Sequence, residues 1–140
     1  MDKNFESKFS ALQADMVSIC LEYCEQKATT IFIHVICEKD SVFANFFFRM
    51  NGALYRKALL GNNIGTVSLL RQKEALSIVT KSVWALVKLC KEENNPVPTE
   101  IKLIYDVQTG HLDANYGYSS VITDNKSARD ITETWFSSYV

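Results

Sequence analysis

Two histidines are the only imidazole side chains in this 140-residue chain, and each is a candidate for acid–base chemistry. In the segment TGHLDANYGYSS, residues 109–120, His111 stands two residues before Asp113, and Asp106 lies across a glycine-containing turn. Residues two apart on a strand share one face, so a hydrolytic site with a histidine base is conceivable here. Polar residues at a hairpin tip are normally only solvated, and we therefore expect no enzymatic activity.

The other histidine, His34, lies in the apolar run IFIHVIC. A single histidine among apolar neighbours is more often a hydrogen-bonded core residue than a metal ligand or a catalytic base. We expect His34 to be such a core residue.

Known catalytic, nucleotide-binding and metal-binding motifs are absent from the sequence. There is no GxGxxG, GxxxxGK[ST], GxSxG or HExxH pattern, and the four cysteines form no CxxC pair. Cys20 and Cys24 are four residues apart and could share a helix face, but no histidine lies near them in the sequence. We expect buried thiols, no metal and no cofactor.

The spacing of apolar residues predicts the elements that position these side chains. Helical spacing covers residues 3–26 and 66–92 and returns in a short helix from about residue 127, capped by Asp124 or Ser127. Three strands are expected at 30–37, 42–50 and 53–58, and Asn51-Gly52 is a strong hairpin signal between the last two. In the first two strands both alternating sets are apolar, which predicts cover on both faces.

A second hairpin is expected in IKLIYDVQTGHLDANYGYS, residues 101–119, with its turn at 108–110. Its alternation directs one set of side chains inward and the other outward. Tyr116 belongs to the inward set and is assigned to the core. Together the elements predict one α+β domain, residues 1–140: an antiparallel sheet of about five strands packed against an N-terminal helix, a long central helix and a short C-terminal helix.

Composition and charge limit the classes of partner. The sequence shows no signal peptide and no apolar run long enough to span a bilayer, which predicts a cytosolic protein. Residues 1–91 contain 12 Lys or Arg and 8 Asp or Glu, a net charge of +4, whereas residues 92–140 contain 3 and 8, a net charge of −5. An acidic surface repels nucleic acid and attracts basic proteins, although a solvated surface with chance clustering is the alternative.

These features favour a protein-interaction surface on the second hairpin. Tyrosines give large contact area at low entropic cost, and carboxylates beside them steer a basic partner. The candidate partner-binding residues are Asp106, His111, Asp113, Asn115, Tyr118 and Asp124. We expect neither nucleic acid nor membrane as a partner.

The order of elements resembles the YezG-like family of bacterial immunity proteins. The resemblance covers nearly the whole chain, from the hairpin IFIHVICEKDSVFANFFFRMNG to the second hairpin, where Gly110, Leu112, Asp113, Tyr116 and Tyr118 match the family's loose pattern. It implies a cytoplasmic antitoxin that binds and neutralises a cognate toxin, commonly a nuclease with a basic cleft, delivered by contact-dependent or specialised secretion systems. It supplies no catalytic residue.

The alternative is a non-catalytic adaptor or chaperone-like domain that binds other proteins. The sequence leaves open which toxin would be bound, whether its active site or a neighbouring surface would be blocked, and the oligomeric state. An aromatic strand at a sheet edge would also invite pairing with a second chain.

Overall fold

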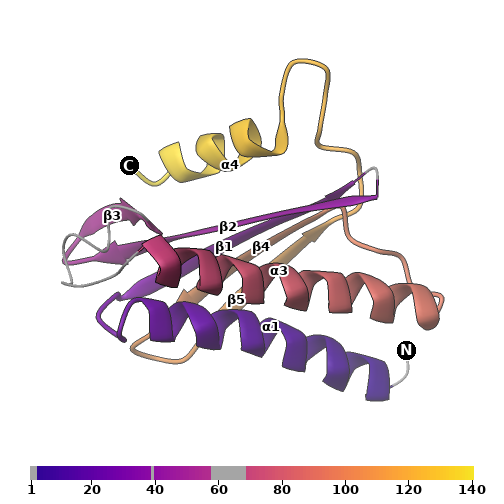
Figure 1. Ribbon diagram of the computed structural model, residues 1–140, viewed down its shortest axis with the longest axis horizontal. Helices are drawn as coiled ribbons and strands as arrows, with labels where there is room; N and C mark the ends of the chain where they lie inside the picture. Colours follow the sequence, from indigo (N-terminus) through magenta and orange to yellow (C-terminus); the bar gives the residue numbers. More distant parts are fainter. Residues whose placement is uncertain (1–2, 39, 58–68) are drawn as a thin grey trace.

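Five antiparallel strands form one sheet, as expected from the sequence, and their order is β3-β2-β1-β4-β5 (Figure 1). The structure is a computed structural model and describes residues 3–38, 40–57 and 69–140. The strands are β1 (Thr30–Glu38), β2 (Ser41–Met50), β3 (Ala53–Arg56), β4 (Glu100–Asp106) and β5 (Leu112–Gly117). Because β1 pairs with both β2 and β4, it is the central strand, and β5 forms one edge of the sheet.

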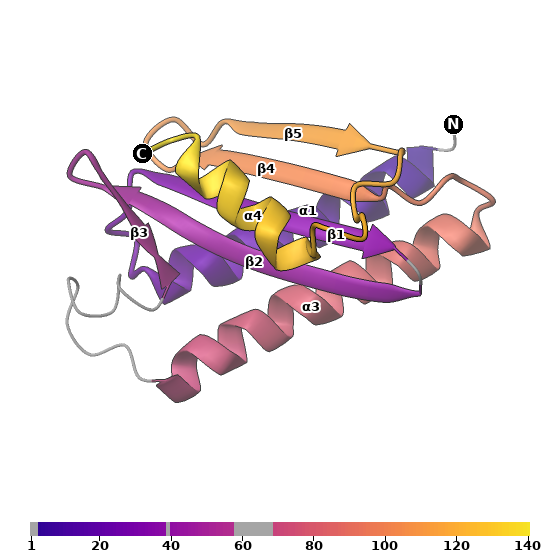
Figure 2. The same ribbon diagram turned by 90° about the horizontal axis from the view of Figure 1, so that it is seen from above.

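Helices cover the two faces of the sheet unequally. Helices α1 (Lys3–Tyr23) and α3 (Leu69–Glu92) lie together against one face, and α4 (Ala128–Ser137) lies alone on the other (Figures 1 and 2). The chain is therefore α+β, with three layers where α4 crosses the sheet. None of the described helices has the length and apolar character needed to cross a membrane.

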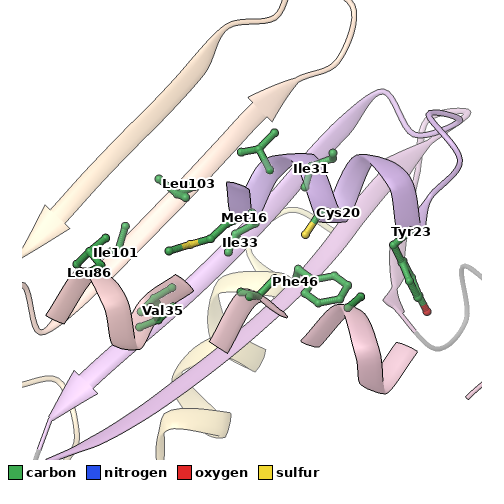
Figure 3. Packing of buried hydrophobic residues seen from close by; sticks show 14 of the residues in the cluster. Met16, Cys20, Tyr23, Ile31, Ile33, Val35, Phe46, Leu86, Ile101 and Leu103 are labelled. Atoms are coloured by element: carbon green, nitrogen blue, oxygen red, sulfur yellow. The ribbon is translucent and has the colours of Figure 1, made fainter. Parts of the chain in front are cut away.

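The main core lies between the sheet and the two long helices (Figure 3). Alternation along β1 sends Ile31, Ile33 and Val35 to this side, where they are almost completely buried. Met16 and Cys20 of α1 and Leu86 of α3 pack against them and have no exposed surface. On the α4 side, Phe32, His34 and Ile36 of β1 are buried as well, which confirms that the middle of β1 is covered on both faces.

A smaller aromatic cluster fixes α4 to the opposite face. Trp135 of α4 meets Phe47 and Phe32 edge-on, with ring centroids 5.2 and 5.9 Å apart, and Phe136 meets Phe47 in the same way at 5.0 Å. Aromatic pairs at these separations add to the stabilisation from burial. Helix α4 begins with Ser127 as its N-cap, whose hydroxyl and backbone form a reciprocal capping box with Asp130.

The turns follow the local sequence signals, and some element boundaries move. Asn51 and Gly52 have φ values of 53° and 79°, as the hairpin prediction requires, and Gly110 has φ 75° in the second hairpin. The first helix ends at Tyr23, not at 26, because Glu25 and Gln26 take positive φ in the turn that reverses the chain. The third strand ends at Arg56. Residue 58 of that predicted strand and residues 66–68 of the predicted second helix lie outside the described residues.

The cysteines are free and mostly buried, as expected. Cys20, Cys24 and Cys90 are buried and Cys37 is partly so. Burial raises the pKa of the Cys37 thiol to about 11, so it stays protonated and poorly nucleophilic at neutral pH. Within the described parts of the chain, no group of three or more His, Cys, Asp or Glu side chains is arranged to hold a metal ion.

Candidate functional site

The hairpin β4–β5 carries most of the predicted partner-binding residues, and its turn is built by one of them. The Asp106 carboxylate oxygen Oδ1 accepts hydrogen bonds from the backbone N–H groups of Gln108 and Thr109, at 2.9 and 3.1 Å. These bonds fix the turn in the way that aspartates commonly do. Asp106 therefore shapes the hairpin, in addition to any role toward a partner.

His111 and Asp113 follow the turn, and both project into solvent. Their side chains are 71% and 78% exposed, and the His111 Nε2 atom lies 3.7 Å from Asp113 Oδ1. An exposed pair at this distance is weak.

Asp113 and Asn115 border a groove between the sheet and α4. This α4–β5 groove has a volume of about 350 Å³ and is lined by Lys102, Ile104, Asp113, Ala114, Asn115, Trp135 and Tyr139. Strand pairing explains the arrangement, because Asn115 lies opposite Lys102 and Asp113 opposite Ile104 on the α4 side of the sheet. The Lys102 ammonium also lies 5.5 Å from the centre of the Trp135 ring. The groove thus combines an aromatic wall with polar and charged groups of both signs.

Tyr118 lies on the other side of the hairpin. With 57% of its surface exposed, it borders a pocket of about 410 Å³ that also contains Phe5, Phe9 and Tyr116. The helix side of β5 is therefore aromatic, whereas the α4 side is polar. The six predicted residues do not form one patch: Asp113 and Asn115 share the groove, and Tyr118 is separated from them by the thickness of the sheet.

The assignment of Tyr116 to the core is wrong. Tyr116 keeps 37% of its surface exposed. Its ring meets Phe9 edge-on at 5.7 Å, and its hydroxyl accepts a hydrogen bond from Gln13 Nε2 at 2.6 Å. Strand β5 extends past the cover that α1 provides, so its inward residues reach the rim of the core and not its interior. Ala114 is exposed for the same reason.

Asp124 is separate from the hairpin. It lies exposed in a turn closed by the bridge between Thr123 and Lys126. It does not cap α4, because Ser127 occupies that position. The loop before this turn is tied to the sheet by Glu38, whose Oε2 atom accepts the N–H groups of Val121 and Ile122 at 3.0 and 2.8 Å.

Strand β5 is an edge strand with an open side. The N–H of Asp106 donates to the carbonyl of His111, and that of Thr99 donates to the carbonyl of Gly117, so the odd-numbered residues of β5 turn their backbone groups toward β4. The backbone groups of Leu112, Ala114 and Tyr116 therefore point away from the sheet. They are bonded to no other residue that the structure describes, and they could pair with an added strand.

His34 is a buried, hydrogen-bonded core residue, as predicted. It has no exposed surface, and its Nδ1 and Nε2 atoms lie 2.8 Å from Thr132 Oγ1 and 2.7 Å from Glu100 Oε2. A neutral ring satisfies both contacts when Nε2 donates to the carboxylate and Nδ1 accepts from the hydroxyl. The order Thr–His–Glu resembles a nucleophilic triad, but Thr132 is only 2% exposed. Because no substrate reaches the hydroxyl, the cluster acts to join α4 to the sheet.

Sequence reasoning did not identify Glu100 and Thr132 as the partners of His34. Register places Glu100 opposite Ile36, on the α4 side of the sheet. The local sequence signal for this role is slight: Glu100 is a glutamate at the start of the otherwise largely apolar strand β4. Thr132 comes from α4, so its contribution depends on how that helix docks.

The titration of His34 predicts how stability depends on pH. Burial lowers the pKa of His34 from its ordinary value of 6.5, and the hydrogen bond to Glu100 opposes the shift only in part. The unfolded chain then binds a proton more readily than the folded one, so stability falls as pH drops through about 6.5. We expect the free energy of unfolding, measured in urea between about pH 7.5 and pH 5.5, to decrease with acidity.

The matched variants are His34→Gln and His111→Gln. The first removes the buried titrating group and should flatten the pH dependence, and the second removes the exposed histidine and should leave it unchanged. If stability instead rises on acidification, the interaction with Glu100 outweighs burial, and the inferred lowering of the His34 pKa is wrong.

In comparisons with known proteins, the chain matches no protein-family model and no curated protein.

Proposed function

We propose that this chain is an immunity protein that binds a cognate protein toxin along the β4–β5 hairpin. The observation that carries the proposal is the open edge of β5, where free backbone groups lie between the polar α4–β5 groove on one side and the pocket of Tyr118 on the other. The resemblance to YezG-like immunity proteins supplies the class of partner.

The edge and the two pockets suit an extended segment of another protein. A strand added to β5 would place alternate side chains on opposite faces of the sheet. One set would meet the rings of Phe9, Tyr116 and Tyr118, and the other would meet Asp113 and Asn115. A partner segment that alternates apolar or aromatic residues with basic or polar ones fits this surface.

Charge supports a basic partner. Residues 92–140, which include both hairpin strands and α4, carry a net charge of −5, and Asp113 is exposed beside the edge. Carboxylates at the rim of an interface accelerate encounter with a positive surface. A nuclease toxin with a basic cleft for its substrate has such a surface, and binding there would block it sterically and electrostatically. Inhibition of this kind needs no catalysis, no metal and no cofactor, and it would take place in the cytoplasm.

The test begins with the neighbouring genes: where one of them encodes a secreted protein with a toxic C-terminal domain, that domain is the candidate partner. We expect the purified chain to bind that domain and to protect cells that express it. Asp113→Lys should weaken binding by about tenfold or more at low salt, mainly through a slower association rate, because like charges would then meet at the rim. Kinetic binding measurements at two salt concentrations check this.

Glu74→Lys is the matched control. Glu74 is an exposed acid on α3, outside the groove and the pocket that flank β5, so its reversal makes the same charge change away from the hairpin and should leave binding intact. Equal losses for both variants would indicate a general effect of net charge. A folded Asp113→Lys variant with unchanged binding would place the interface elsewhere, and a chain that binds but does not protect would favour an adaptor.

A further inference from the structure

A cavity of about 420 Å³ lies near the other edge of the sheet, away from the β4–β5 hairpin. It exists because β3 is short: its four residues pair only with Phe47–Met50, whereas β2 begins at Ser41. Beyond β3, residues of α3 and α4 approach β2 from opposite faces of the sheet. Gln72 and Leu76 line the cavity from α3, and Arg129 and Glu133 line it from α4.

Three cations line this cavity, and a single carboxylate accompanies them. The cations are Arg56, Lys57 and Arg129, and the carboxylate belongs to Glu133. That carboxylate is already engaged, because the Arg56 guanidinium donates two hydrogen bonds to it and also lies 4.1 Å from the centre of the Phe136 ring. Counting all four groups, the lining carries a net charge of +2.

Lys57 is held in place without a carboxylate of its own. Its ammonium donates to the neutral amide oxygen Oδ1 of Asn45 at 2.5 Å. Burial, followed by the nearby charge of Arg129, lowers the pKa of Lys57, and Glu133 opposes this only in part. A lowered pKa in a lysine means that its charge is undercompensated, so an anion beside it would be favourable.

Arg129 lies in the first turn of α4, where the helix itself disfavours a positively charged side chain. It is the second residue of α4, and the N-terminal turn of a helix carries a positive partial charge that favours acidic residues. The neighbouring Asp130 carboxylate is used by the capping box with Ser127. The Arg129 guanidinium donates no hydrogen bond to any residue within 3–38, 40–57 or 69–140. Its donors are therefore available to a ligand at the cavity.

We propose that this cavity binds a phosphate group. A dianion would balance the net charge of the lining, which a single carboxylate would not. Arginine and lysine donate strong charge-assisted hydrogen bonds to phosphate oxygens, and the side-chain amides of Asn45 and Gln72 add neutral donors. The rings of Phe46, Phe47 and Phe136 line the rest of the cavity, so the phosphate could be free or belong to the monoester of a small aromatic molecule.

The experiment titrates the full chain by calorimetry with two probes, inorganic phosphate and phenyl phosphate, at constant ionic strength. We expect saturable binding of at least one of them. Tighter binding of phenyl phosphate would identify a monoester as the ligand, and equal binding would identify the bare anion. Arg129→Gln and Lys57→Gln should each weaken binding by about tenfold or more, since each removes charge-assisted hydrogen bonds.

Lys126→Gln is the control, because it removes a positive charge three residues before Arg129 from a side chain that does not line the cavity. It should leave the affinity unchanged. Circular dichroism establishes that each variant is folded. If neither probe binds, or if Arg129→Gln binds as tightly as the unaltered chain, the cavity is not a phosphate site. Because the cavity and the hairpin are separate, an unaltered chain that binds toxin but neither phosphate probe would overturn only this proposal.

Discussion

Replacing His34 with leucine should lower the free energy of unfolding by about 3 kcal/mol, the expected cost of leaving a buried hydroxyl and a largely buried carboxylate without their hydrogen-bond partner. Leucine fills most of the space but offers no hydrogen bond. The Thr132 hydroxyl is then left without a partner in a site that is 2% exposed, and the Glu100 carboxylate, whose side chain is 17% exposed, loses its donor. Urea denaturation at pH 7.5 measures the loss.

A second substitution separates lost hydrogen bonding from poor packing. In a chain that already carries His34→Leu, Thr132→Val removes the stranded hydroxyl and should restore about 1 kcal/mol, because replacing both partners by apolar groups avoids the desolvation cost. Thr132→Val alone should destabilise. If the two losses simply add, the hydrogen bond between these side chains contributes nothing, and the cluster is only a packing contact.

Trp135→Ala should destabilise the protein by about 3–5 kcal/mol, the range for truncating a large aromatic side chain in a core. Trp135 is 8% exposed and contacts Phe32, Phe47 and His34. Its removal opens a cavity in the middle of the small aromatic cluster, between the rings of Phe32 and Phe47 and the His34 side chain. Guanidinium denaturation monitored by circular dichroism gives the change.

Trp84 provides a control of the same residue type. It lies on α3, and 46% of its surface is exposed, so Trp84→Ala should change the free energy of unfolding by less than about 1 kcal/mol. Similar losses for the two tryptophans would show that α4 is held by something other than the Trp135 cluster.

The elements and their pairing could be predicted because their signals are local. Alternation in β1 and β2 and the dipeptide Asn51-Gly52 were sufficient to place these strands and to pair β2 with β3. The predicted helix ends were less accurate. The positive φ of Glu25 and Gln26, residues that rarely adopt it, arises from the path of the chain toward β1 and leaves little trace in the sequence.

The candidate site was predicted only in part because its geometry depends on tertiary packing. The alternation of residues along the β4–β5 hairpin correctly predicted that Asp113 and Asn115 face away from the main core. It did not show that α4 would lie beside them to form a groove, or that α1 would stop short of covering Tyr116. The same limit applies to His34, whose burial could be inferred from its neighbours although its partners Glu100 and Thr132 could not. Periodicity predicts which face of an element a residue lies on, whereas its burial and its contact partners depend on tertiary packing.

The lone helix on the second face has a consequence for how the protein is made. Helix α4 follows every strand that the structure describes, so during synthesis the strands become available to pack on α1 and α3 before α4 can cover Phe32 and Phe47. Uncovered aromatic surface on a nascent sheet favours aggregation. Synthesis and docking of α4 therefore decide whether these rings are buried by their own helix or stay exposed to other chains.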